Sequence, residues 1–156
     1  MITCFFEDQG KALLRHVTFT GIAEKNGKIL IEKRATNLTQ GNKFALPGGF
    51  LSRDESVKEG IVREVKEETG YESTIKDLFR INDNPNRANE DRQNVDFTYI
   101  ITIGEKTSLP DSEVQEVFWF DLNNLPPEEY FAFDHYEIIM LYKKYLQEKF
   151  PLPIIG

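Results

Sequence analysis

Three glutamates within five residues offer a way to hold a metal ion. Glu64, Glu67 and Glu68 stand at positions i, i+3 and i+4 of one stretch, a spacing that places them on one side of an α-helix. Like charges this close repel one another unless a cation compensates them, and hard divalent cations prefer carboxylate oxygens. The spacing therefore predicts a magnesium site, although a solvated helix face is the alternative for three acids taken alone.

The segment that carries these acids has the pattern of an amphipathic helix. Between about residues 56 and 69, Val57, Ile61 and Val65 recur every four positions, and charged residues fill most of the rest. Gly70 follows where a helix commonly ends, because glycine accepts the left-handed backbone of the last turn. We expect this helix to pack its apolar stripe on a β-sheet.

The other elements follow from turn signals and hydrophobic patterns. Two β-branched and aromatic runs, 16–23 and 28–34, flank Asn26-Gly27, a strong signal for a two-residue hairpin turn. The polar segment 82–94 is too long for a simple hairpin turn and is a candidate binding loop. Strands with helices between and after them predict an α/β sandwich. The remaining predicted elements are strands at 44–46, 73–81, 95–103 and 114–122 and a helix at about 135–149.

The chain as a whole has the size and composition of one globular domain. Its 156 residues are 40% hydrophobic and 29% charged, with no repeat or low-complexity tract. A formal net charge of −7 argues against a nucleic-acid partner. No apolar run reaches the roughly 20 residues of a membrane span, and Met1 is not followed by a signal-peptide pattern. We therefore expect a cytoplasmic protein with no membrane partner.

Cysteine chemistry is not expected. Cys4 is the single cysteine of the sequence, so an intrachain disulfide is impossible and a cysteine-built zinc site would lack its partners. We interpret Cys4 as a packing residue, the alternative being a reactive thiol. His16 and His135 belong to no nucleophile or zinc pattern and are interpreted as structural.

The helix and the turn before it carry a longer motif. Gly49 is followed after five residues by Glu55, and after seven more by Arg-Glu-Val-Lys-Glu-Glu-Thr-Gly-Tyr at 63–71. This string resembles the Nudix box, in which glycine and glutamate at this spacing precede Arg-Glu-aliphatic-any-Glu-Glu-any-Gly-aliphatic. Only Tyr71 departs from the pattern, in a place where we expect an effect on packing rather than on chemistry. A Leu-Pro-Gly-Gly entry and a Glu-Val-Phe-Trp-Phe-Asp strand near the end extend the likeness more loosely.

The resemblance implies a fold and a reaction class. It implies a single Nudix hydrolase domain over 1–156, with a short N-terminal extension at 1–15, the box at 49–71, and an α/β/α sandwich around a mixed β-sheet. It further implies a Mg²⁺-dependent enzyme, with Mn²⁺ as the alternative ion, that hydrolyses a nucleoside diphosphate linked to another group. The extension is similar to the remnant that precedes this domain in relatives with a zinc ribbon, but the ribbon cysteines are absent, so no zinc is expected.

Roles for the residues of the box also come from the resemblance. The box acids and a backbone carbonyl just before them are implied as the metal set, in which Glu55 supports the site from nearby. Arg63 is implied to orient Glu64 through an ion pair. The predicted metal set is Gly48, Glu55, Glu64, Glu67 and Glu68.

The general base has several candidates, because the family draws it either from the box or from a later loop. Glu64 is the first choice. Glu116 is the second, although an exposed strand carboxylate is an equally good interpretation of it. Glu113 and Glu90 are further acids beyond the box.

The substrate must be read from residues outside the box. Pro85 lies fifteen residues after Gly70, where the ADP-ribose branch carries a proline, although a proline is also typical of any loop. The leading hypothesis is hydrolysis of ADP-ribose to AMP and ribose 5-phosphate. The alternatives are a nucleoside triphosphate pyrophosphohydrolase that removes oxidised nucleotides and a non-catalytic sensor of nucleotide metabolites.

Cations and aromatic rings could contact such a substrate. Arginine matches phosphate geometry with two donors, and an aromatic ring can stack on a base, although each of these residues is also typical of surface or core. Homodimers are common in the family, and a symmetric interface leaves no mark that can be read from one sequence. The candidate cations are Arg34, Arg80, Arg87 and Arg92, and the candidate rings are Phe44, Phe79 and Tyr99.

Overall fold

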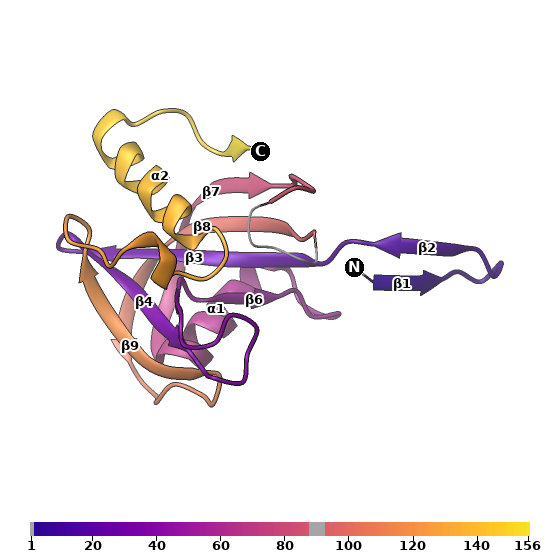
Figure 1. Cartoon of the computed structure of the whole chain (residues 1–156), viewed down its shortest axis with the longest axis horizontal. Coiled ribbons are helices and arrows are strands. Elements are labelled where there is room, and N and C mark those ends of the chain that lie inside the picture. The colour runs from indigo at the N-terminus through magenta and orange to yellow at the C-terminus, as the bar shows by residue number, and fades with distance from the viewer. Residues whose placement is uncertain (1, 88–92) are drawn as a thin grey trace.

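Thirteen elements make up the computed structural model of the protein (Figure 1), which describes residues 2–87 and 93–156. The strands are β1 (Ile2–Phe5), β2 (Lys11–Leu14), β3 (Val17–Lys25), β4 (Lys28–Arg34), β5 (Phe44–Ala45), β6 (Gly48–Phe50), β7 (Tyr71–Asn82), β8 (Val95–Lys106), β9 (Val114–Asp121) and β10 (Ile154–Ile155). The helices are α1 (Val57–Thr69), the 3-10 helix η1 (Glu128–Tyr130) and α2 (His135–Glu148).

The main sheet is mixed, as predicted. Its strands run in the order β10-β7-β8-β3-β4-β5, with β6 paired to β3 and β9 paired to β4. The β3–β8 and β10–β7 pairs are parallel, and the others are antiparallel. The two parallel pairs join segments that are distant in the sequence, which is why strand patterns alone did not reveal them.

The predicted hairpin between β3 and β4 is present but short. Asn26 and Gly27 both have positive φ, 55° and 76°, as the favoured two-residue turn requires. Only Glu24 and Lys25 pair with β4, opposite Ile29 and Lys28. Beyond that point β3 pairs with β8 and β6, whereas β4 pairs with β9 and β5. The two strands therefore enter different halves of the sheet.

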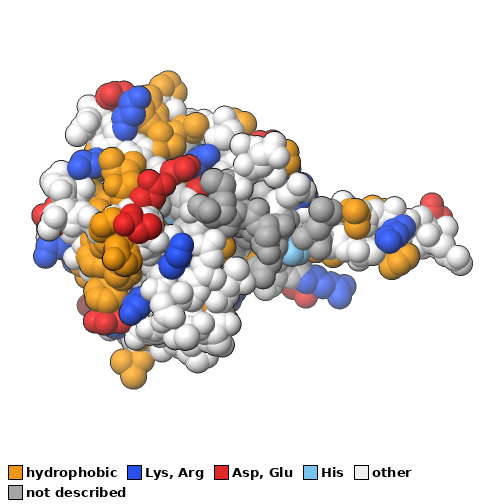
Figure 2. All heavy atoms as spheres, viewed as in Figure 1, with side chains coloured by type: hydrophobic (Ala, Val, Ile, Leu, Met, Phe, Trp, Pro, Cys, Tyr) orange, Lys and Arg blue, Asp and Glu red, His pale blue; other side chains and the backbone are white. Residues whose placement is uncertain are grey.

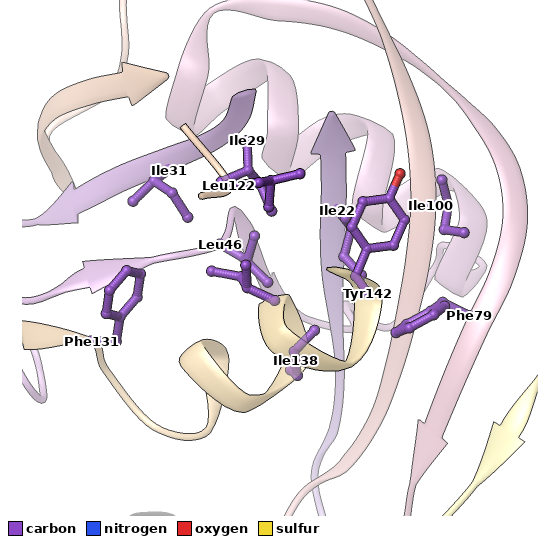
Figure 3. Packing of buried hydrophobic residues seen from close by; sticks show 11 residues of the cluster. Ile22, Ile29, Ile31, Leu46, Phe79, Ile100, Leu122, Phe131, Ile138 and Tyr142 are labelled. Atoms are coloured by element: carbon purple, nitrogen blue, oxygen red, sulfur yellow. The ribbon is translucent and has the colours of Figure 1, made fainter. Parts of the chain in front are cut away.

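The two long helices cover opposite faces of the sheet, so the predicted α/β/α sandwich is confirmed. Successive residues of β4 alternate between these faces. Ile29 and Ile31 pack in a cluster that contains Ile138 of α2 (Figure 3), while Leu30 packs in a second cluster with Val65 of α1. All five side chains are at most 1% exposed. This burial of apolar surface fixes how α1, with its acidic side, lies against the sheet.

Two segments formed structure that the sequence did not predict. The break expected at Pro47-Gly48-Gly49 contains β6, which pairs antiparallel with β3. The N-terminal extension forms a separate two-stranded sheet, β1–β2, that projects from the body of the molecule (Figure 1). Within residues 2–87 and 93–156, no helix has the length and apolar character needed to cross a lipid bilayer.

Candidate active site

A cavity of about 380 Å³ brings several predicted residues together. Glu64, Glu67 and Glu68 of α1 line one wall, beside Gly48 and Gly49 of β6. The other walls come from β3, β8, the segment before β9 and the start of α2. The volume falls in the range of small-molecule sites, roughly 300–1,000 Å³. The acidic face of the helix therefore lines a cavity, which the solvated-face interpretation did not anticipate.

The start of α1 is fixed by a capping box. The Ser56 hydroxyl accepts a hydrogen bond from the Glu59 backbone N–H at 3.3 Å, and the Glu59 carboxylate accepts one from the Ser56 backbone N–H at 2.8 Å. Gly70 ends the helix with φ of 78°. Because both ends of α1 are defined, the positions of its glutamates along the cavity wall are fixed.

Gly60 sets the distance between α1 and the sheet. A Cβ atom at this position would lie 2.4 Å from Cε1 of Phe19, far inside contact distance. Phe19 belongs to β3 and is 1% exposed. The helix can therefore approach β3 closely only because residue 60 has no side chain.

Arg63 is bound to three carboxylates. Its Nε and one terminal nitrogen donate to the two oxygens of Glu55 at 2.9 and 2.8 Å. Its other terminal nitrogen lies 2.9 Å from Glu64 and 2.8 Å from Glu67. The hydrogen bonds from Arg63 lower the pKa of Glu55 to about 2. Glu55 does not line the cavity and holds Arg63 from behind, while the ion pair to Glu64 has the implied geometry.

The two glycines before α1 allow close contact with the carboxylates. The Gly48 backbone N–H donates to Oε2 of Glu68 at 2.8 Å, and a Cβ on Gly48 would lie 2.2 Å from the Phe19 carbonyl oxygen. A Cβ on Gly49 would lie 2.4 Å from Oε1 of Glu64. Any side chain at either position would displace the carboxylates or the strand.

Glu32 is a further buried acid that no sequence motif indicated. Glu32 of β4 is 1% exposed and forms a hydrogen bond with the Glu68 side chain. Burial is the main cause that raises its pKa to about 8, against an opposing effect of Arg34. Burial, together with the charges of Glu32 and Glu64, also raises the pKa of Glu68. The alternation of β4 was the available signal, because Glu32 follows Leu30 by two residues and so faces α1.

The carboxylates fit a divalent cation held mostly by substrate and water. Within the described ranges, no three His, Cys, Asp or Glu side chains lie close enough together to hold a metal ion by themselves, so substrate and water oxygens would have to supply the rest of the shell. Burial raises the pKa of Glu64 and Glu68, and nearby carboxylates add to the rise, so a cation would relieve an existing repulsion. Mg²⁺ commonly binds one or two carboxylates and completes its shell with phosphate and water. An open wall of oxygen donors suits that pattern.

The wall around the start of α2 holds a buried ion-pair network. One terminal nitrogen of Arg87 donates to Asp134 at 2.5 Å, and Asn82 donates to the same carboxylate at 3.3 Å. Burial favours the neutral acid, but the hydrogen bond and charge of Arg87 outweigh it and lower the pKa of Asp134. Arg87 also lines the cavity. Sequence reasoning chose Arg87 without finding its partner.

His135 follows Asp134 at the same wall and is uncharged. Its Nδ1 accepts a hydrogen bond from the Leu46 backbone N–H at 2.9 Å, and burial lowers its pKa to about 4. The proton of the neutral ring is therefore on Nε2. His135 lines the cavity, so it can offer a donor to a ligand.

Arg34 also lines the cavity, as a substrate-binding candidate should. Its guanidinium lies 5.3 Å from the centre of the Phe133 ring. Phe133 has φ of 52°, a left-handed conformation that is rare for a bulky residue. Its backbone N–H donates to the Gln40 side chain at 3.1 Å. Such backbone strain is concentrated at functional sites.

Other predicted residues are placed away from the cavity. Phe44 packs in an aromatic cluster with Phe118, Phe120 and Phe131. Glu116 is an exposed residue of β9 opposite Lys33. The cavity wall instead includes two acids that precede β9, Asp111 and Glu113.

The remaining candidates that the structure describes are also not found in the cavity wall. Arg80 donates to the Gly156 carbonyl oxygen at 3.1 Å and lies 3.6 Å from Asp134, behind the cavity wall. Pro85 is exposed and is not among the cavity residues. Glu90 and Arg92 lie outside the described residues.

Comparison with known proteins identifies a protein family that the chain matches. A family model described as the NUDIX domain matches residues 13–142. A curated ADP-ribose pyrophosphatase from Methanocaldococcus jannaschii is 42% identical over 130 residues, which cover 83% of this chain and 73% of that protein.

Solved structures share the fold. The crystal structure of an ADP-ribose pyrophosphatase from Streptococcus suis matches with a TM-score of 0.75 and 22% identity, covering 92% of this chain and all of the other. The NUDIX domain of Shewanella oneidensis NrtR, in complex with ADP ribose, matches with a TM-score of 0.66 and 21% identity over 86% of this chain and 90% of that one.

Proposed function

The chain belongs to the Nudix family and is a Nudix hydrolase, a diphosphatase; from this premise we propose that it hydrolyses ADP-ribose to AMP and ribose 5-phosphate. The observation that carries the substrate is the 42% identity, over most of both chains, with an ADP-ribose pyrophosphatase. The cavity is consistent with such a substrate, because it offers carboxylates on one wall and arginine and polar hydrogen-bonding side chains on the others. The diphosphate belongs at the α1 wall.

We propose Mg²⁺ as the ion, with Mn²⁺ as the alternative. Glu64, Glu67 and Glu68, with the backbone carbonyl of Gly48, are the proposed ligands. When bound, a divalent cation neutralises charge on the phosphoryl oxygens and lowers the pKa of the attacking water.

The side chains of the α1 wall then orient and deprotonate that water. We assign the base to Glu64, which lines the cavity beside Glu67 and Glu68 and can accept a proton as a carboxylate. The water oxygen forms a bond to one phosphorus, its proton goes to Glu64, and the bond from that phosphorus to the bridging oxygen breaks. Arg63 holds the Glu64 carboxylate in place. Glu113, which lines the cavity, replaces Glu116 as the second candidate for the base.

A substrate panel tests the proposal. ADP-ribose, other nucleotide sugars, dinucleotides and nucleoside triphosphates are incubated with Mg²⁺, with Mn²⁺ or with chelator, and the products are separated by chromatography. We expect AMP and ribose 5-phosphate from ADP-ribose, and no turnover with chelator. Release of pyrophosphate from a triphosphate in preference would assign the enzyme to removal of oxidised nucleotides. Saturable binding without turnover of any compound would favour a sensor.

We also propose that the protein is a homodimer. Apolar side chains of the projecting β1–β2 sheet (Figure 2) are exposed, with Ile2 at 45%, Phe5 at 69% and Leu13 at 62%, and exposed apolar groups of this kind commonly mark an interface. Light scattering should give twice the mass of one chain. The double variant Phe5→Ser, Leu13→Ser should give the mass of a single chain; a monomeric wild type would contradict the proposal.

A further inference from the structure

Asp96 of β8 is a buried acid in the cavity wall, and it has no role in the proposed hydrolysis. It is 1% exposed and lines the cavity. It lies in β8 between two apolar residues, Val95 and Phe97. A buried carboxylate is costly unless its oxygens accept hydrogen bonds, so its surroundings show what it can still bind.

Three threonine hydroxyls surround this carboxylate. Thr18 and Thr20 of β3 donate to Oδ1 at 2.9 and 3.1 Å, and Thr98 donates to Oδ2 at 2.9 Å. A carboxylate can accept about four hydrogen bonds. The threonines use both positions on Oδ1 and one on Oδ2. The three threonines therefore hold the Asp96 side chain rigidly. One acceptor position remains, on Oδ2 of this cavity-lining carboxylate.

The strand register places Asp96 away from the phosphate end. Thr18 of β3 pairs with Phe50 of β6 on one side and with Asp96 on the other. Two spacings of about 4.8 Å separate β6 from β8, so the Asp96 backbone lies roughly 10 Å from that of β6. A molecule whose diphosphate lies at β6 and α1 would reach this distance with a group about one sugar ring beyond its phosphates.

The chemistry of this wall selects the group. A negative carboxylate repels a phosphate, so its open acceptor position suits a hydrogen-bond donor such as a sugar hydroxyl. The neighbouring lining residues are polar, namely two threonines, Asn94, Arg87 and His135, which offers an Nε2–H. A sugar, which carries hydroxyls that donate and accept, matches the Asp96 wall.

We propose that Asp96, held by Thr18, Thr20 and Thr98, is a specificity-determining residue that accepts a hydrogen bond from a sugar hydroxyl of the substrate. This inference rests on the proposed function, because it takes the diphosphate to lie at the α1 wall. The hydroxyl belongs to one of the two riboses of ADP-ribose, the adenosine ribose or the terminal ribose.

Two analogues distinguish the two riboses. One lacks the 2′- and 3′-hydroxyls of the adenosine ribose, and the other carries a tetrahydrofurfuryl group in place of the terminal ribose. We expect the wild type to prefer ADP-ribose over one of them by at least about 10-fold in kcat/KM, because a site built to bind a hydroxyl rejects an analogue that lacks it. Equal kcat/KM for all three compounds would overturn the proposal.

The variant Asp96→Asn tests the residue itself. We expect it to reduce that preference to less than about 3-fold, mainly through KM, because the amide is a weaker acceptor and turns a donor toward the ligand. Asp77→Asn, the same change at an exposed position of β7, is the matched control and should keep the wild-type preference. A folded Asp96→Asn protein with the wild-type preference would contradict the proposal.

A second measurement does not depend on the folding of that variant. A crystal structure of Glu64→Gln with ADP-ribose and Mg²⁺ should place a sugar oxygen within about 3.2 Å of an Asp96 oxygen. A bound ligand with no sugar oxygen there would overturn the inference. Failure of the proposed function is read separately, as absence of ADP-ribose hydrolysis by the wild type. The hydroxyl comparison would then be repeated on the ribose of the nucleotide that the substrate panel identifies.

Discussion

The carboxyl groups of Glu32 and Glu68 lie hydrogen-bonded to each other between β4 and α1. Their side chains are 1% and 3% exposed, and burial raises the pKa of both. Two carboxylates in buried contact cannot both ionise at neutral pH, so the pair shares one proton. Glu68, a proposed metal ligand, is therefore in contact with Glu32, an acid that the family motif does not include.

This pair makes the stability of the metal-free protein dependent on pH. The pKa of Glu32 is about 8 in the folded chain against 4.5 as its ordinary value, so the folded state binds more protons between these values. Its contribution to stability is complete below about pH 4.5 and is lost as the pH rises through 8. In chelator, we expect the Tm of the wild type to fall by about 5 °C more than that of Glu32→Gln between pH 5 and 8.

Scanning calorimetry at both pH values measures this difference. Glu148→Gln is the matched control, because Glu148 is an exposed residue of α2, and its Tm should follow that of the wild type. Parallel pH profiles for wild type and Glu32→Gln would show that Glu32 ionises normally in the folded chain.

Glu64→Gln should remove most turnover with little effect on folding. A neutral amide binds a cation poorly and accepts no proton from water, so we expect kcat to fall by at least about 100-fold. The amide retains the shape that fits against Gly49, so Tm should change by less than about 3 °C. Steady-state kinetics and thermal unfolding are measured together, again with Glu148→Gln as control. Wild-type kcat would remove Glu64 from the reaction.

Arg63→Lys should slow the reaction although the charge is kept. Lysine cannot make the two parallel hydrogen bonds that Arg63 makes to Glu55, so Glu64 loses its fixed orientation. We expect kcat to fall by about 10-fold or more with a smaller change in KM. Glu55→Gln should have a similar effect, and the double variant should be no worse than the more impaired single variant. Additive losses would mean that the two residues act independently.

Gly60→Ala should destabilise the protein although alanine favours helix. The new methyl group would lie 2.4 Å from the Phe19 ring, and overpacking of this kind costs about 1–3 kcal/mol in free energy of unfolding. Lys58→Ala, at an exposed position of the same helix, is the control and should be neutral or slightly stabilising. Urea unfolding of both variants measures the difference. Equal stability would show that α1 can move away from β3 without cost.

Local patterns were enough for most elements and for the acidic wall. Helix α1, its glycine end and the Asn26-Gly27 turn depend on contacts within a few residues, so their signals are complete in the sequence. The same holds for Glu64, Glu67 and Glu68, because helical spacing alone brings them to one side. Bounds shifted by only a few residues, as at β7, predicted at 73–81 and found at Tyr71–Asn82.

Among the residues that were predicted from their type alone, the fold places some in the cavity wall and others away from it. Arg34 and Arg87 line the cavity, but Arg80 and Phe44 do not. Glu113 lines it and Glu116 does not, although they stand three residues apart. No local rule separates such pairs, because the orientation of a side chain depends on which strand or helix packs beside it.

By itself, the sequence determined the family, the helix that carries the carboxylates and the α/β arrangement, because each depends on spacing along the chain. Only the tertiary structure decided which distant residues share the cavity. The parallel pairing of β3 with β8 brings Thr18 and Thr20 to Asp96, about 76 to 78 positions away, and the packing of α1 on β4 brings Glu32 to Glu68. Contacts of this kind form when strands pair and apolar faces are buried, and that pairing is a property of the whole chain rather than of any segment.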